Sequence, residues 1–394
     1  MRVGLANDGY PEKRCIIGNQ NDDFINYNGK NIYKYINYLK GKVFKSAPDF
    51  LFKPYAPSAI DDAEIFHFFN HIGLVNKSWV STFETIIPRI TETMDIHRQA
   101  DGKNSYHKSK KTNELLTAIS KDNCLGIFAL SQSAYDIQMA MLEAYPELLE
   151  PIREKMQVIH PPQELLTSSL NNKHATDGPV KFIFVGSDFY RKGGAELVLA
   201  FSELLSNGDI AADAISVTLV GDISRRGNYV HGDFQDNIEF YEDIEHRLNS
   251  LPCITHFSSL PNKTVLENIA SSHVGLLPTW GDTYGYSVLE MQASGCPVIT
   301  TNVRALGEIN PPHAGWLIAA PINKYREIVI TSVEDKNHVR RKMVDGLKTA
   351  IISAVNDKQS ISEKAQASIN RIKAEHDPDT YFKKIKSIYR QNRN

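Results

Sequence analysis

The 394-residue sequence is poor in cysteine, and its cysteines form no Cys-x-x-Cys pair and have no histidine cluster beside them. This scarcity argues against a disulfide framework or a zinc site, so we expect buried, reduced thiols in a reducing cytosol. The four positions are Cys15, Cys124, Cys253 and Cys296.

Long apolar runs are also missing, since none approaches the roughly 18–20 residues that a membrane span requires. The N-terminal stretch MRVGLANDGYPEKRC lacks the apolar segment of a signal peptide. We therefore expect a soluble cytoplasmic protein, with room for a peripheral contact on the inner face of a membrane.

A basic excess is absent too, because 44 Lys and Arg face 46 Asp and Glu, for a net charge of −2. A nucleic-acid-binding protein would carry a clear basic excess, so that class is disfavoured. Neither G-x-G-x-x-G nor a P-loop occurs, which removes the two common nucleotide fingerprints. Two segments are locally basic: the run KNSYHKSKK (103–111) and the group Lys34, Lys40, Lys42 and Lys45. They could contact an anionic membrane, or they could simply lie in solvated loops.

Short apolar runs alternate with longer helical patterns along the whole chain, which is typical of βαβ units. A polar stretch at 163–179 resembles a linker and separates two such halves. The pattern predicts two Rossmann-like domains facing each other across a cleft, with ligands at the carboxyl ends of the strands. The expected strands are 1–6, 63–69, 79–83, 124–131, 156–162, 180–186, 215–221, 254–260, 273–279 and 297–301. The expected helices include 194–206, 262–272 and 287–293, and the chain is mostly helical after about residue 325.

The stretch VGSDFYRKGG (185–194) joins a strand to a helix and brings Arg191 and Lys192 to the helix start. A helix N-terminus favours phosphate, and an Arg with a Lys beside it suits a diphosphate. The alternative interpretation is that both cations are solvated loop charges and the glycines are turn residues.

The stretch GDTYGYSVLEMQASGCPVITT (281–301) carries Asp282 in a strand-to-helix loop and Glu290 one turn into the helix. Glycines there allow a ligand to approach the backbone, and the first helical N–H groups can hold phosphate. Two carboxylates at this separation suit the hydroxyls of two sugar rings. The alternative is a turn-forming Asp and a surface Glu.

Together these two stretches, over most of 180–320, resemble the retaining GT-B glycosyltransferases of the family-four group, whose motif is an acidic residue, seven residues and a Glu. The resemblance implies that Glu290 accepts from the ribose hydroxyls and Asp282 from the donor hexose. It implies that Lys192 with Arg191 neutralises the diphosphate leaving group. The remaining donor-binding residues that it implies are Gly186, Ser187, Phe257, Leu260, Tyr284, Gly285, Tyr286 and Ser287.

Three positions depart from the family pattern. Asp282 stands where the family usually has the longer Glu, and Ser187 stands where it usually has Arg. Glu84, within VSTFETIIPR (80–89), occupies roughly the place of an acceptor-side His, while His67 and His71 nearby suit core or surface positions equally.

The expected fold is α/β of the GT-B type, with an acceptor-binding domain at 1–165 and a donor-binding domain at 175–376. The C-terminal helix, about 377–394, is expected to pack back onto the first domain. The expected activity is retaining transfer of a sugar from a nucleoside-diphosphate sugar to a glycan or lipid-linked acceptor hydroxyl in cell-surface polysaccharide or glycolipid biosynthesis. No metal ion, other cofactor or nucleic acid is expected to bind. The alternative functions are a GT-B nucleotide-sugar epimerase and a non-catalytic glycosyltransferase-like binding subunit.

Overall fold

A computed structural model of the protein describes residues 1–18, 22–167 and 178–391. The chain divides into two compact units. Unit 1 comprises Met1–Pro162 with His376–Asn394, and unit 2 comprises Gln163–Glu375. Most of the linker expected at 163–179 lies outside the described residues.

Unit 1 is built on a parallel six-stranded sheet in the order β2-β1-β4-β6-β7-β8. Its two central strands, β4 and β6, are buried at every residue, as expected for strands covered on both faces of a parallel sheet. The strands are β1 (Arg2–Leu5), β2 (Asp23–Asn26), β4 (Ile65–Phe69), β6 (Trp79–Phe83), β7 (Cys124–Ala129) and β8 (Met156–Val158). A separate parallel pair consists of β3 (Leu51–Phe52) and β5 (Ile72–Gly73).

The C-terminal helix α14 (Pro378–Arg390) belongs to unit 1 and is tied to it by tyrosines. The Tyr389 hydroxyl lies 2.6 Å from His67 Nδ1 in β4, and the Tyr381 hydroxyl donates to the carbonyl of Cys15 at 2.7 Å. The other α-helices of unit 1 are α1 (Tyr10–Glu12), α2 (Ile32–Leu39), α3 (Thr91–Met94), α4 (Lys110–Ser120), α5 (Gln132–Leu142) and α6 (Pro146–Arg153). Two π-helical turns, η1 (Lys13–Ile17) and η3 (Lys40–Phe44), extend α1 and α2.

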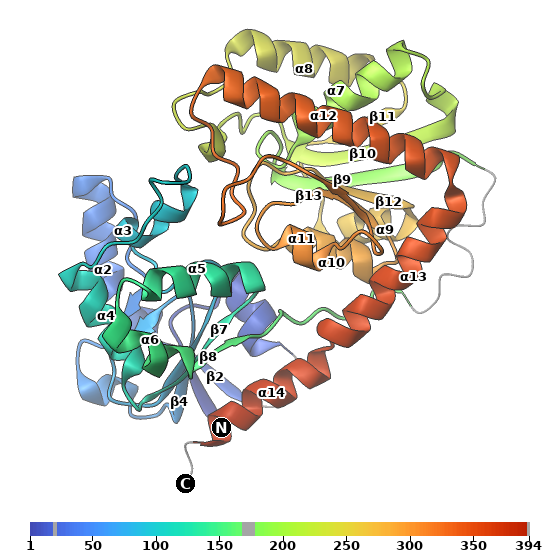
Figure 1. Cartoon of the computed structure of the whole chain (residues 1–394). Coiled ribbons are helices and arrows are strands. Elements are labelled where there is room, and N and C mark those ends of the chain that lie inside the picture. The colour runs from blue at the N-terminus through green and yellow to red at the C-terminus, as the bar shows by residue number, and fades with distance from the viewer. Residues whose placement is uncertain (19–21, 168–177, 392–394) are drawn as a thin grey trace. The chain divides into compact units, whose positions relative to one another are not determined.

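Unit 2 holds a second parallel sheet in the order β11-β10-β9-β12-β13-β14. Figure 1 shows α7, α8 and α12 on one face of this sheet and α9 and α10 on the other. The strands are β9 (Val180–Asp188), β10 (Ile215–Asp222), β11 (Ile254–Phe257), β12 (Val274–Leu277), β13 (Val298–Thr301) and β14 (Trp316–Ile318). The helices are α7 (Gly194–Ser206), α8 (Ile238–Ser250), α9 (Asn262–Ser271), α10 (Tyr286–Ala293), α11 (Leu306–Ile309), α12 (Val333–Asn356) and α13 (Lys358–Glu375).

The structure differs from the sequence expectations at a few elements. The run 103–111 is not one loop, because Ser109 caps α4 by accepting from the Thr112 N–H, and Lys110 and Lys111 lie in that helix. The strand expected at 254–260 ends at Phe257, since the polar Ser258-Ser259 pair follows it. Among the described residues, no helix combines the length and the apolar character needed to cross a bilayer.

Candidate functional site

Two loops that are about 90 residues apart in sequence meet in unit 2. Strands β9 and β12 are parallel neighbours, with Phe184 paired to Leu276 near their carboxyl ends. The loop after β9 leads into α7, and the loop after β12 leads into α10. Ligands of open parallel sheets bind at this end of the strands, so the two loops form the candidate site.

Both helices begin directly after a glycine that no other residue can replace without strain. Gly193, before α7, has a φ of +90°, and Gly285, before α10, has a φ of +94°. A Cβ on Gly193 would lie 2.0 Å from the carbonyl oxygen of Pro278, and one on Gly285 would lie 2.5 Å from Leu306. Gly193 therefore lets the two loops touch, and both helices start at the edge of the sheet where the strands have their carboxyl ends.

Lys192 and Asp282 form an ion pair across the two loops. The Lys192 ammonium donates to the Asp282 carboxylate, and both side chains are largely buried, at 15% and 12% exposure. The Tyr284 N–H also points at this carboxylate, 3.4 Å from Oδ1. Burial alone would raise the pKa of Asp282, but the charges of Lys192 and Arg191 and the hydrogen bonds outweigh it and hold the pKa below its usual value. The carboxylate is thus ionised at neutral pH.

Arg191 joins the same two loops through three hydrogen bonds to two acceptor groups. Its Nε and Nη2 donate to the Asp188 carboxylate, and its Nη1 donates to the Gly281 carbonyl at 2.7 Å. The guanidinium also lies 5.5 Å from the centre of the Tyr229 ring. Arg225, on the loop after β10, donates to the same Asp188 at 3.2 Å but is 57% exposed. Arg191 therefore braces the loops, whereas Arg225 is the more accessible cation.

The other residues expected to bind the donor differ in how far they are exposed to solvent. Gly186 is buried in β9, and a Cβ there would lie 2.7 Å from Cβ of Lys192, so the glycine makes room for that side chain. Ser187 is exposed on the same strand. In the second loop and α10, Tyr284 and Gly285 are buried, while Tyr286, Ser287 and Glu290 are half-buried.

Phe257 and Leu260 lie further away, at and after the end of the edge strand β11. Two strand spacings separate β11 from β9, which is about 10 Å. The Phe257 side chain is 38% exposed, so a flat aromatic surface is accessible at that edge. The carboxyl ends of these strands thus carry charged groups at β9 and β12 and an exposed aromatic group at β11.

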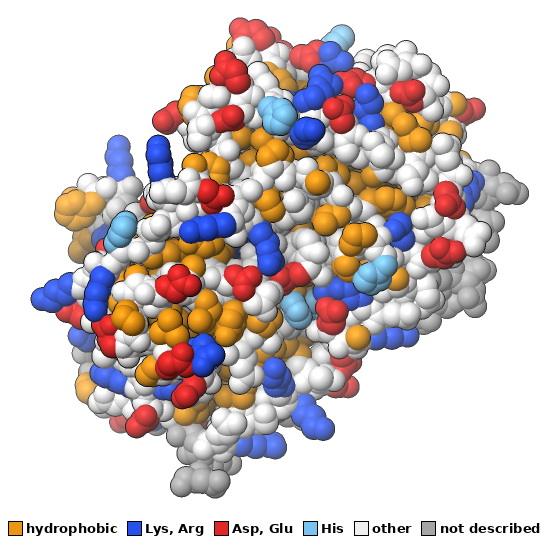
Figure 2. Space-filling view, viewed as in Figure 1, with side chains coloured by type: hydrophobic (Ala, Val, Ile, Leu, Met, Phe, Trp, Pro, Cys, Tyr) orange, Lys and Arg blue, Asp and Glu red, His pale blue; other side chains and the backbone are white. Residues whose placement is uncertain are grey.

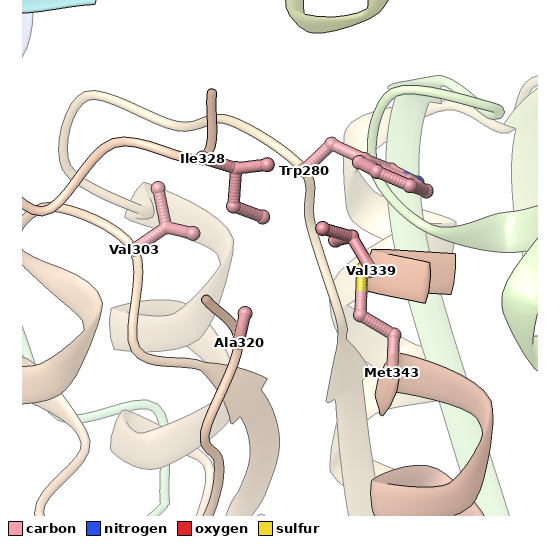
Figure 3. Packing of buried hydrophobic residues seen from close by; sticks show 6 residues of the cluster. All are labelled: Trp280, Val303, Ala320, Ile328, Val339 and Met343. Carbon is pink, nitrogen blue, oxygen red and sulfur yellow. The ribbon is translucent and has the colours of Figure 1, made fainter. Parts of the chain in front are cut away.

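The loop that carries Asp282 is anchored by the neighbouring Trp280. Figure 3 shows Trp280 pointing towards Val339 of α12, within a cluster of buried apolar side chains. The His231 ring packs edge-on against Trp280 at 4.5 Å. The cluster comprises Trp280, Val303, Ala320, Ile328, Val339 and Met343. Asp282 is therefore positioned by the core of unit 2.

Buried charges connect α12 to the first turn of α7. Arg340 donates to Glu196 at 3.0 Å and to Asp236 at 2.7 Å, and Lys336 pairs with Asp236 at 2.8 Å. Burial raises the pKa of Glu196 even though Arg340 lowers it. These pairs hold the start of α7, which follows Lys192, against α12.

In unit 1, Glu84 follows directly after β6 and is held by two neighbours. The Glu84 N–H donates to the Asn70 side chain at 3.2 Å, and Arg89 Nη1 donates to the Glu84 carboxylate at 2.6 Å. His67 and His71 are both buried, and burial lowers their pKa to about 3 and about 4. The two histidines are therefore neutral core residues.

Asp188 and Tyr229 contact Arg191, and Arg225 contacts Asp188, although none of the three was predicted from the sequence. Asp188 stands three residues before Arg191 in VGSDFYRKGG (185–194), and this spacing was the available signal for an ion pair. Arg225 and Tyr229 come from the loop after β10, about 40 residues away, and carry no local signal of their proximity to Arg191.

The family described as "Glycosyl transferases group 1" matches residues 168–347 of the chain. No curated protein sequence matches. Among solved structures, a glycosyltransferase from Rickettsia africae aligns with a TM-score of 0.56 and 13% identity over 99% of this chain and 89% of its own. Sucrose-phosphate synthase from Thermosynechococcus elongatus aligns with a TM-score of 0.56 and 15% identity over 96% and 82%. Anabaena HepE in complex with UDP and glucose aligns with a TM-score of 0.55 and 12% identity over 98% and 90%.

Proposed function

Because residues 168–347 belong to the glycosyl transferases group 1 family, we propose that this GT-B glycosyltransferase moves a sugar, with retention, from a nucleoside-diphosphate sugar to an acceptor hydroxyl. The observation that carries the proposal is the Lys192–Asp282 pair, which lies at the carboxyl ends of β9 and β12 beside two glycine-led helix starts. A cation, a carboxylate and the N-terminus of a helix are the partners that a diphosphate-linked sugar requires.

Each residue has a distinct task in the proposed reaction. Lys192 and the N-terminal N–H groups of α7 and α10 stabilise the negative charge that develops on the departing diphosphate. Asp282 accepts from hydroxyls of the transferred sugar, and Glu290 accepts from the ribose. Arg191 keeps the two loops in register through Asp188 and Gly281. Phe257 flanks the base at the sheet edge.

The proposed chemistry proceeds on one face of the sugar. The bond from the anomeric carbon to the diphosphate oxygen breaks through an oxocarbenium-like transition state. A diphosphate oxygen takes the acceptor's proton, and the acceptor oxygen bonds to the anomeric carbon on the same face. The proposal requires no metal ion and no protein base at the anomeric carbon.

Unit 1 is proposed to bind the acceptor, with the Glu84–Arg89 pair after β6 as its polar group. A carboxylate and a guanidinium side by side suit a glycan, because sugar hydroxyls both donate and accept. The acceptor is proposed to be a glycan or a lipid-linked sugar of a cell-surface polysaccharide or glycolipid pathway.

The decisive experiment begins with a thermal-shift screen against UDP-, GDP-, ADP- and dTDP-sugars. A donor at about 100 times its Kd stabilises the folded state by about 2.7 kcal/mol, which is a clear rise in Tm. With that donor, Lys192→Met and Glu290→Gln should each lower kcat/KM for transfer at least about 100-fold. The matched control for Lys192→Met is Lys181→Met, at an exposed lysine of β9. The matched control for Glu290→Gln is Glu267→Gln, on α9.

Each contrary outcome has a definite meaning. If Lys192→Met or Glu290→Gln transferred sugar at a rate near that of the wild type, the assignment of the donor site would be wrong. Conversion of the free donor without any acceptor would identify an epimerase. Donor binding without transfer or hydrolysis across an acceptor panel would identify a binding subunit.

A further inference from the structure

The segment from Ile32 to Phe44, formed by α2 and the π-helical turn η3, exposes an unusual concentration of large apolar side chains. Seven of the fifteen exposed large apolar side chains found among the described residues lie here. Phe44 is 74% exposed and Tyr38 is 64% exposed. The seven are Ile32, Tyr35, Ile36, Tyr38, Leu39, Val43 and Phe44.

The polar side of α2, and not its apolar side, is fixed to the rest of unit 1. The Asn31 side chain caps the helix and bonds to Lys53 N and Leu51 O, and the Asn37 side chain bonds to both backbone groups of Asp49 at 2.9 Å. No residue of α2 is buried. A helix on a soluble protein normally turns its apolar stripe to the core, so this orientation is reversed.

Four of the seven apolar side chains follow the helical repeat and form one face. Ile32, Ile36, Leu39 and Val43 are spaced by four, three and four residues, which places them on one side of the helix. Figure 2 shows orange side chains beside a blue one over α2 and the turn after it, at the left of the view. We call Ile32–Phe44 the α2 face.

The charged residues of the segment that contains the α2 face are all lysines. Residues 24–48 contain five lysines and no Asp or Glu, in a chain with a net charge of −2. Lys40 is paired with Asp49 at 3.0 Å, whereas Lys34, Lys42 and Lys45 are exposed. Apolar side chains beneath a rim of lysines match the chemistry of an anionic lipid surface, where the lysines meet the headgroups and the apolar residues enter the acyl boundary.

We propose that the α2 face binds an anionic membrane surface peripherally. A second copy of the chain is the poorer occupant, because a two-fold contact through this face would bring its lysines against the same lysines of the partner. The inference concerns unit 1 alone and is independent of the chemistry at Lys192 and Asp282.

Flotation of the full chain with phosphatidylcholine vesicles, and with vesicles containing 30% phosphatidylglycerol, tests the proposal. The wild type should float with the anionic vesicles only, and salt should weaken the binding. Lys42→Gln with Lys45→Gln should weaken it about tenfold or more, from a loss of roughly fivefold per lysine. Val43→Ser with Phe44→Ser should weaken it by more than about tenfold.

Matched controls distinguish binding through the α2 face from nonspecific adsorption of the protein to vesicles. Ile238→Ser changes another exposed apolar residue, and Lys263→Gln changes another exposed lysine, both in unit 2, and neither should alter flotation. Far-UV circular dichroism and a urea unfolding midpoint equal to those of the wild type would show that the face variants remain folded. Absence of anionic vesicle binding, or binding unaffected by Val43→Ser with Phe44→Ser, would overturn the proposal, as would a dimer or an acidic protein found on the face in place of lipid.

Discussion

At the scale of the residue, Arg191 and Arg225 bind the same Asp188 carboxylate but differ in what else they hold. A lysine at 191 cannot reproduce the guanidinium fork that reaches both Asp188 and the Gly281 carbonyl. We expect Arg191→Lys to cost about 1–3 kcal/mol of stability and to weaken donor binding. Urea unfolding and donor titration measure the two effects.

Arg225→Lys is the control for this comparison. Its side chain is 57% exposed, so the substitution should change stability by less than about 0.5 kcal/mol. Equal losses in the two variants would refute the bracing role of Arg191.

At the scale of the element, the start of α7 depends on the contact between Gly193 and Pro278. Gly208, just past the end of α7, also has a positive φ, of +73°, but a Cβ there meets nothing within 4 Å. Gly208→Ala should therefore cost only the backbone strain, about 1–2 kcal/mol. Gly193→Ala should cost about 1–3 kcal/mol more and reduce donor binding, because the Pro278 loop must move. Similar unfolding midpoints for the two variants would contradict this packing.

At the scale of the whole molecule, both units bury a neutral histidine. Burial lowers the pKa of His67 to about 3 in unit 1 and of His231 to about 4 in unit 2. Unfolded histidine titrates near 6.5, so below that pH the unfolded chain binds protons that the folded chain does not. Stability should therefore be complete above about pH 7 and fall by about 1.4 kcal/mol per pH unit for each such histidine on acidification towards pH 4.

Urea unfolding between pH 7 and pH 5 measures this slope, which His67→Gln should reduce. His313→Gln, at an exposed histidine, should leave the slope at its wild-type value. A slope that His67→Gln does not reduce would show that other groups govern the acid response.

The sequence by itself determined the local elements and the resemblance to a glycosyltransferase family over residues 168–347, since strand and helix patterns and the Asp282-to-Glu290 spacing are properties of neighbouring residues. The α/β GT-B prediction and the glycosyltransferase prediction are confirmed. The roles of Lys192, Asp282, Glu290 and Glu84 stay predictions. Helix starts at Gly193 and Gly285 follow from residues that stand beside them in the chain, so they too were within reach of the sequence.

Only the tertiary structure decided which groups meet. Lys192 reaches Asp282 across 90 residues, and His67 reaches Tyr389 across 322, because parallel strands and a returning helix bring distant segments together. The sequence also did not show that the α2 face points to the surface. Its periodicity resembles that of a core helix, and the contacts of Asn31 and Asn37 with residues 49–53 turned the apolar side to the surface. A periodic pattern states which residues share a face; the partners available in the fold determine whether that face is buried.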